Sequence, residues 1–263
     1  MGGIALIWII DCFVGFYLTL PRRKASPKTP RSISVERQLA RGFWSRWKPA
    51  WALKTTGSAY RITFDIHRTA GLWVWAFLFI LAVTSASLNF YRELTQPIAR
   101  FFSSVIPSPL DLRERRPRGK PIEPTLTFSD ILERAIAAAA HRHWSEPPGA
   151  ITYAPLYGIY RVAYFQRGND HGAADVGSAA VYFDSADGRY LGDRIPWQGT
   201  AGDLFLQIQS PLHSGRIAGM PGRILISFMG LVVATLSVTG VVIWYRKRRA
   251  RLARRLAVAR IAD

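Results

Sequence analysis

Two of the five histidines in this 263-residue sequence lie near the ends of long apolar runs with an arginine close by, and such pairs could hold a haem. His67 is followed directly by Arg68, and His213 precedes Arg216 by three positions. An imidazole nitrogen can ligate haem iron, and a guanidinium can pair with a haem propionate. A lone histidine is more often a hydrogen-bonded structural residue than a haem ligand. The elements that carry the two pairs therefore decide between a structural role and a role as ligand.

The sequence contains three long apolar runs, residues 4–20, 70–91 and 224–245. His67 lies just before the second run, and His213 lies ahead of the third. A helix needs about 20 apolar residues to cross a bilayer, and the second and third runs meet this length without a charge. The first run is shorter and contains Asp11. No basic residue precedes it and no small-residue cleavage site follows it, so a spanning helix is favoured over a signal peptide. We therefore predict a mainly α-helical membrane protein with three transmembrane helices.

The distribution of the +18 net charge predicts the orientation of these helices. Residues 21–68 hold 12 Lys/Arg and 2 Asp/Glu, and residues 246–263 hold 8 and 1, whereas residues 92–223 hold 15 and 13. Basic segments stay in the cytoplasm, so the first two are predicted to be a cytoplasmic loop and tail. Residues 92–223 then form a periplasmic loop of a bacterial inner-membrane protein. The N-terminus falls outside, from which we expect a preceding helix to be missing.

The basic segments are interpreted as topology determinants that contact the anionic headgroups of the lipid bilayer. Nucleic-acid binding is not expected, because no base-stacking aromatics are interleaved with the basic residues of the tail. Trp44, Trp47 and Trp51 follow one another at spacings of three and four. This pattern predicts one face of a short amphipathic segment at the membrane interface.

The periplasmic loop is predicted to contain a small α+β unit at about residues 127–195. A helix over Thr127–His143 begins at the signal Leu126–Asp130. Three strands follow, and the helix could cover one face of their meander; they are expected at Ala150–Ala154, Gly158–Phe165 and Ala179–Phe183. Asp184, Asp187 and Asp193 are more easily interpreted as turn residues than as a metal site.

Placement on opposite faces of a bilayer about 30 Å thick prevents His67 and His213 from ligating one iron. Either there are two metal centres or neither histidine is a ligand. On the outer side His141, His143 or His171 could supply a second ligand, although the first two are favoured as exposed histidines at a helix end. The inner side would need a helix that the chain lacks, or a second subunit.

Two further residues in the apolar runs deserve separate interpretation. Asp11 is expensive to bury in a membrane and is a functional-site candidate by default, although pairing with Thr84 or Ser85 of another helix is favoured over a proton role. Cys12 is the only cysteine, which excludes a disulfide framework and a cysteine-based metal site.

Several stretches resemble the PepSY-associated transmembrane family of bacterial inner-membrane proteins, often labelled as linked to iron uptake. The segments that carry this resemblance are Ile10–Pro21, Phe64–Trp73, Tyr160–Val162, Val181–Gly188, Pro211–Arg216, Gly219–Arg223 and Val238–Trp244. Family members usually have four spans, and the first begins with a further histidine. The resemblance therefore implies a PepSY-like unit between the last two spans, and partners for His67 and His213 upstream of Met1.

Some family members are similar to haem reductases that pass electrons across the inner membrane to ferric siderophores. The resemblance implies haem b, in up to two copies, with His67 as an inner-side axial ligand and His213 as an outer-side one. Arg216 is expected from its charge to pair with a propionate. The electron donor would be an unidentified cytoplasmic partner.

An alternative function belongs to a different class. PepSY domains elsewhere resemble inhibitory or chaperone modules of peptidases, which implies a membrane-anchored binding or regulatory module with no cofactor. A truncated, inactive gene product is the third interpretation.

Overall fold

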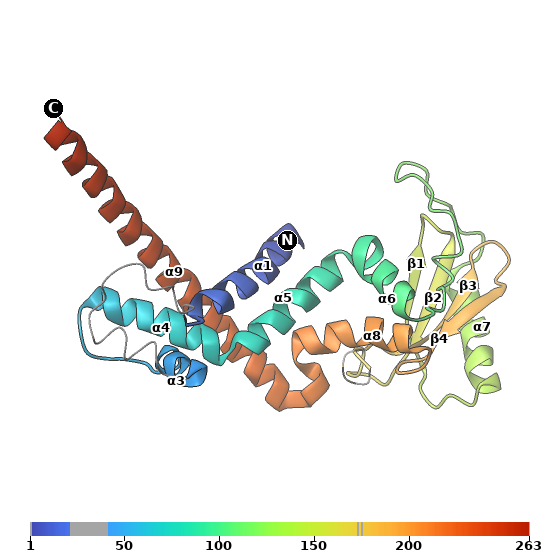
Figure 1. Ribbon diagram of the computed structural model, residues 1–263. Coiled ribbons are helices and arrows are strands. Elements are labelled where there is room, and N and C mark those ends of the chain that lie inside the picture. The colour runs from blue at the N-terminus through green and yellow to red at the C-terminus, as the bar shows by residue number, and fades with distance from the viewer. Residues whose placement is uncertain (1, 22–41, 173, 175, 263) are drawn as a thin grey trace. The chain divides into compact units, whose positions relative to one another are not determined.

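The computed structural model describes residues 2–21, 42–172, 174 and 176–262, with side chains as far as residue 255. Most of the first half of the predicted basic loop, residues 22–41, lies outside the described residues. The chain forms two compact units (Figure 1). Unit 1 comprises Met1–Val83 and Ile224–Asp263, and unit 2 comprises Thr84–Arg223.

Unit 1 is built from apolar helices. It contains α1 (Gly2–Thr19), α3 (Phe43–Trp47), the short helix η1 (Lys48–Ala50), α4 (Ala59–Trp73), the start of α5 (Trp75–Asn89) and most of α9 (Gly219–Ala262). By length and composition, α1 and the segment Arg216–Arg255 could each cross a membrane. The pair α4 and α5 qualifies as a third span only if a bent pair is counted as one. The described residues therefore hold two to three candidate spans.

The predicted span 70–91 is not one straight helix, because α4 and α5 meet at a bend of 69°. Val74 leaves the helical conformation with φ −108° and ψ 11°. The indoles on either side have different partners: Trp73 Nε1 donates to the Trp51 carbonyl at 3.2 Å, and Trp75 Nε1 donates to the Cys12 carbonyl at 2.9 Å. Hydropathy could not predict the bend, because these partners are distant in sequence.

The interior of unit 1 forms where α1, α5 and α9 meet. Cys12, Leu78, Leu81 and Met229 make up one buried cluster. A second cluster joins Trp47, Ala50 and Leu72, with Phe16 of α1 packed against it. The segment that carries Trp47 and Ala50 therefore packs against α1 and α4.

Unit 2 contains an antiparallel sheet of order β1-β2-β3-β4 with one helix on its face. The strands are β1 (Pro148–Ala154), β2 (Ile159–Tyr164), β3 (Ala179–Asp184) and β4 (Tyr190–Arg194). The first three confirm the prediction. The expected three-strand meander was wrong in number, because β4 was missed: its sequence contains Gly192 and two charged residues, and its register shifts opposite Tyr182 and Phe183.

The helix α7 (Phe128–His141) covers this sheet and confirms the predicted helix. Thr127 and Asp130 form a reciprocal capping box at its start. The core consists of Ile131, Ala135 and Ala139 of α7 and alternate residues of the central strands, which share one sheet face: Tyr160, Val162, Tyr164, Val181 and Phe183.

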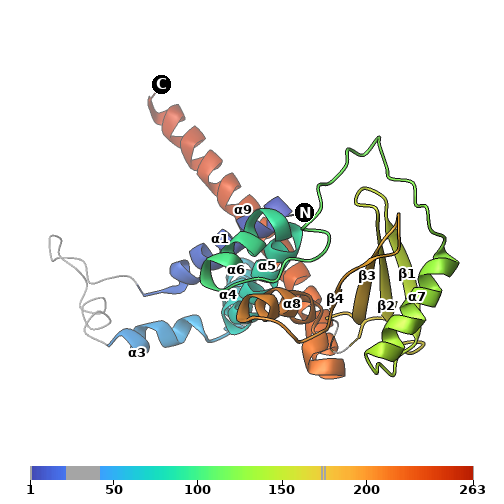
Figure 2. The same cartoon turned by 90° about the vertical axis from the view of Figure 1, so that its right-hand side faces the viewer.

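The remaining helices of unit 2 were not predicted. They are η2 (Tyr91–Thr95), α6 (Gln96–Phe102) and α8 (Ala201–Ser214), followed by the short turn η4 (Arg216–Ala218). Thr200 and Asp203 make a second capping box that begins α8. Within unit 2 the sheet lies between α7 and α8 (Figures 1 and 2). The helices α7 and α8, which carry His141 and His213 in their last turns, thus lie on different sides of the sheet.

Candidate functional site

His67 lies on α4 and its imidazole is held by α9. Its Nδ1 atom is 2.9 Å from Oγ1 of Thr239. The hydroxyl of Thr239 donates back to its own helix, with the carbonyl oxygen of Thr235 at 2.7 Å. A hydroxyl has one proton, so when it is used in this way Thr239 must accept from the imidazole. His67 is then protonated on Nδ1, and Nε2 carries the lone pair that a metal would need.

The close approach of α4 and α9 depends on a glycine. A Cβ atom built on Gly240 would lie 3.3 Å from Cε1 of His67, and one on Gly71 would lie 3.9 Å from Leu236. The first distance is tighter than ordinary van der Waals contact, whereas the second is ordinary. Gly240 therefore leaves room for the imidazole of His67 beside α9.

A buried carboxylate near His67 was missed by the sequence analysis. Asp65 is 0% exposed, and Arg61 Nε donates to its Oδ2 at 2.9 Å. Arg68 Nη2 lies 2.9 Å from Oδ1 as an ion pair and also donates to the Pro49 carbonyl at 3.2 Å. The spacings of four and three along α4 could have predicted this arrangement. The guanidinium of Arg68, a candidate propionate partner, is thus already engaged in packing.

Asp11 lies exposed on α1. Thr84, one of its suggested partners, has its hydroxyl at His213. The carbonyl of Ser85, the other, accepts a hydrogen bond from Asn89. The pairing of Asp11 stays a prediction.

His213 lies in the last turn of α8 in unit 2. Its Nδ1 atom is 3.0 Å from Oγ1 of Thr84, which lies on α5 and is 3% exposed. The helix ends directly afterwards, because Gly215 adopts the left-handed conformation with φ 74°. Like His67, His213 is thus oriented through Nδ1 by a threonine of another helix.

Arg216 follows this turn as the first residue of η4 and is half-buried. Its backbone N–H donates to Oγ of Ser214 at 3.4 Å. A Cβ on Gly222 would collide with the carbonyl of Gly215, so the chain passes closely over itself here. The tight turn keeps Arg216 next to the end of α8 that carries His213.

The other histidines of unit 2 are exposed. His141 is the last residue of α7, and His143 follows it with φ 55°. Both are exposed at the end of this helix, and their role as ligands stays untested. His171 Nε2 lies 3.8 Å from an Asp170 oxygen. The structure does not bring His141 or His143 together with His213.

The three aspartates interpreted as turn residues have structural partners. Asp184 accepts a hydrogen bond from the Ala186 N–H and pairs with Arg113. Asp187 accepts from the Arg189 N–H, and Asp193 pairs with Arg142 at 3.2 Å. Within the described part of the chain, no group of three or more His, Cys, Asp or Glu could hold a metal ion.

Burial of the Asp184 carboxyl favours its neutral form and so raises its pKa, but the opposing interactions are stronger. The hydrogen bond from Ala186 and the Arg113 guanidinium stabilise the carboxylate, so the pKa of Asp184 is below its usual value.

Comparison with known families finds a match. The model of the PepSY-associated TM region matches residues 1–247. A comparison with curated proteins gives no match. The matched range includes both histidines, both threonines and all four strands.

Proposed function

The chain belongs to the PepSY-associated TM family, and we propose that it is an inner-membrane haem-b electron-transfer protein that reduces ferric-siderophore complexes in the periplasm. The observation that carries the proposal is the shared environment of His67 and His213. Each is held at Nδ1 by a threonine of another apolar helix, at 2.9 and 3.0 Å. Holding an imidazole at one nitrogen and presenting the other is how proteins orient axial ligands.

The residues present fit haem better than a free metal ion. A site for a free ion usually takes three or more protein ligands, and the described residues offer no such group. A haem needs only axial ligands from the protein, because the porphyrin supplies the other four. His67 and His213 would each supply one. The second ligand at the outer centre could be His171, and the inner centre would take its second ligand from a further helix or a second subunit.

The side chains around each histidine would then have distinct roles. Thr239 and Thr84 orient the imidazoles, and Gly240 leaves space for one of them. Arg216, next to the end of α8, would pair with a propionate of the outer group. A bound haem would supply one-electron transfer. Reduction of the substrate from Fe(III) to Fe(II) weakens its bonds to hard oxygen ligands, so the chelate releases iron.

The ligand assignment is tested by reduced-minus-oxidised visible spectra of the purified chain, expressed with haem supplied. We expect His67→Ala and His213→Ala each to remove or shift one b-type signal. The double variant His141→Ala/His143→Ala is the matched control, because both side chains are exposed at the end of α7. Unchanged spectra in both ligand variants would show that the assignment is wrong.

The reductase activity needs a separate test. The dithionite-reduced chain is mixed without oxygen with a ferric siderophore, and the return of the oxidised spectrum is followed by stopped flow. We expect reoxidation that depends on the concentration of the ferric complex and is slowed in His213→Ala. A haem-loaded chain that stays reduced would rule out this class of substrate.

One observation favours the alternative, a membrane-anchored PepSY module that binds a periplasmic peptidase or another partner. The sheet and α7 have a core of their own, so this part could bind a partner without a cofactor. Capture of a peptidase by the full chain should then require residues 127–195 and persist in His67→Ala and His213→Ala. Capture that is lost in either histidine variant would count against the module.

A further inference from the structure

The helical segment 91–102 of unit 2, formed by η2 and α6, buries polar side chains and exposes apolar ones. Thr95 and Gln96 are buried, whereas Phe101 and Phe102 are 83% and 79% exposed. A surface helix of a water-soluble domain normally turns its apolar residues toward the core and its polar residues toward water. The segment shows the inverse arrangement, so its exposed face is suited to an apolar partner.

The exposed apolar side chains of this segment form one stripe. Residues three or four apart lie on the same face of a helix. The exposed apolar residues follow this spacing: Tyr91, Leu94, Ile98, Phe101 and Phe102. Glu93 and Arg100 are exposed at positions outside the stripe. An apolar stripe beside a charged face is typical of helices that lie in a membrane interface.

The segment begins where the apolar helix α5 ends. Phe90 leaves the helical conformation with φ −113° and ψ 41°, so α5 stops at Asn89. Oγ1 of Thr95 donates to the Ser87 carbonyl at 3.0 Å, which ties the segment to the last turn of α5. The helix α5 contains no charged residue and forms part of the third candidate span. The end of a spanning helix lies at the level of the lipid headgroups, so the segment lies there too.

Contacts with α8 fix the orientation of the segment within unit 2. Oγ of Ser103 accepts a hydrogen bond from the Gly202 N–H at 3.0 Å, and the Ile106 N–H donates to Oδ1 of Asp203 at 3.1 Å. A Cβ atom on Gly202 would lie 2.7 Å from the carbonyl oxygen of Ser104, so this glycine permits the close approach. The segment is thus held at the start of α8 while its apolar stripe stays exposed.

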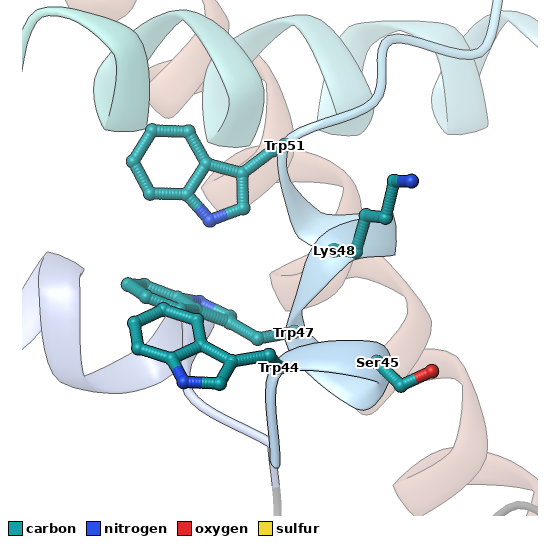
Figure 3. Close-up of a pocket in the computed structure, with 5 residues that line it drawn as sticks. All are labelled: Trp44, Ser45, Trp47, Lys48 and Trp51. Carbon is teal, nitrogen blue, oxygen red and sulfur yellow. The ribbon is translucent and has the colours of Figure 1, made fainter. Parts of the chain in front are cut away.

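The chemistry of the stripe favours acyl chains as its partner. The pocket of unit 1 gives a contrast, because it is lined by the indoles of Trp44, Trp47 and Trp51 (Figure 3). An indole carries an N–H group, which suits a place with one wet side. The rings of Phe101 and Phe102 carry no polar atom, so their transfer among acyl chains is favourable and costs no hydrogen bond.

We propose that segment 91–102 lies in the plane of the membrane, with its apolar stripe against the acyl chains of one leaflet. Lipid is the partner because the stripe is continuous along the chain with α5, which itself exposes Ile80 and Leu88. Helices of this kind bury their apolar face about 5–10 Å into the boundary between headgroups and acyl chains. Unit 2 thereby has a membrane contact of its own, which does not rest on the binding of haem.

The test is electron paramagnetic resonance of single nitroxide labels on the full chain in nanodiscs of phosphatidylglycerol and phosphatidylcholine. Cys12 is the only cysteine, so Cys12→Ala gives a background without other labelling sites. Power saturation compares collisions with oxygen, which concentrates among acyl chains, and with a water-soluble nickel chelate. We expect oxygen to dominate for labels at Ile98→Cys and Phe102→Cys. Arg100→Cys is the matched control on the charged side of the same helix, where nickel should dominate.

Nickel collisions that dominate at Phe102→Cys as they do at Arg100→Cys would overturn the proposal, because the stripe would then face water. Few collisions with either reagent at Phe102→Cys would also overturn it, because protein, such as a second copy of the chain, would then cover the stripe. Phe102 is exposed, so its replacement removes no packing from the core of unit 2. Unchanged helical circular dichroism verifies the fold of each variant.

Discussion

Oγ1 of Thr239 lies 2.9 Å from Nδ1 of His67 and 2.7 Å from the carbonyl oxygen of Thr235. When the single hydroxyl proton is donated to that carbonyl, the hydroxyl accepts a hydrogen bond from Nδ1 of His67. The Nε2 atom then carries the lone pair that a ligand needs. The same pairing of threonine and histidine occurs between Thr84 and His213.

Under the proposed function, removal of the Thr239 hydroxyl should weaken haem binding at His67. We expect Thr239→Val to lower hemin affinity at that centre about 10-fold or more, as for other partners of metal-bound histidines. Thr239→Ser keeps the hydroxyl and is expected to retain the affinity. Hemin titration followed at the Soret band measures both variants. Equal affinity in Thr239→Val and the unaltered chain would contradict the orienting role.

Gly240 offers a steric test of the same centre. A methyl group there would lie 3.3 Å from Cε1 of His67, so Gly240→Ala should displace the ring by a few tenths of an ångström. We expect a shift in the reduction potential or spectrum of the haem proposed at His67. Gly230→Ala is the matched control, because a Cβ at that position meets nothing within 4 Å. Identical spectra of the two variants would show that Gly240 has no part in the site.

Asp184 gives the sheet of unit 2 a defined pH dependence. Its folded-state pKa is lowered, so the stabilisation is fully present above the ordinary carboxyl value of about 3.9. It is lost as the pH falls through the folded value. Asp184→Asn should lower the free energy of opening of the sheet by about 1–3 kcal/mol near neutral pH, and by less below pH 4.

Hydrogen exchange of the β2 and β3 amides in the full chain measures this effect. Asp187→Asn is a suitable control, because Asp187 is exposed and accepts a hydrogen bond from the Arg189 N–H within its own turn. A difference between Asp184→Asn and the unaltered chain that stays constant with pH would contradict the assignment.

The hydroxyl of Tyr164 is a second test of the sheet core. It donates to the Ala135 carbonyl of α7 at 2.9 Å, and burial raises the pKa of Tyr164 to about 12. Tyr164→Phe leaves that carbonyl with one partner fewer and should cost about 1 kcal/mol in the same exchange measurement. No change in amide protection of α7 and β2 would show that the bond contributes nothing.

The sequence predicts those parts of the fold that depend on local patterns. Thr127 and Asp130 lie three apart at the start of α7, and the first three strands show the expected composition. The strand β4 was missed because a glycine and charges obscure its pattern. The bend at Val74 was missed because the carbonyls that bind its flanking indoles lie far away in the sequence.

The sequence predicts the two histidines of the candidate site but not the threonines that lie at hydrogen-bonding distance from them. His67 and His213 were identified from neighbouring arginines and from the apolar runs. Thr239 is 172 positions from His67, and Thr84 is 129 positions from His213. Serine and threonine are frequent in such helices, so no local pattern distinguishes these two. Only the packing of helices brings each threonine to its histidine.

The most direct test of the central claim is the stoichiometry of hemin binding to the purified chain, with excess imidazole as the second axial ligand. Our account predicts that His67→Ala and His213→Ala each lose one binding event and that the double variant loses both. The double variant His141→Ala/His143→Ala should bind as the unaltered chain does. A His67→Ala/His213→Ala chain that titrates like the unaltered chain would contradict the account.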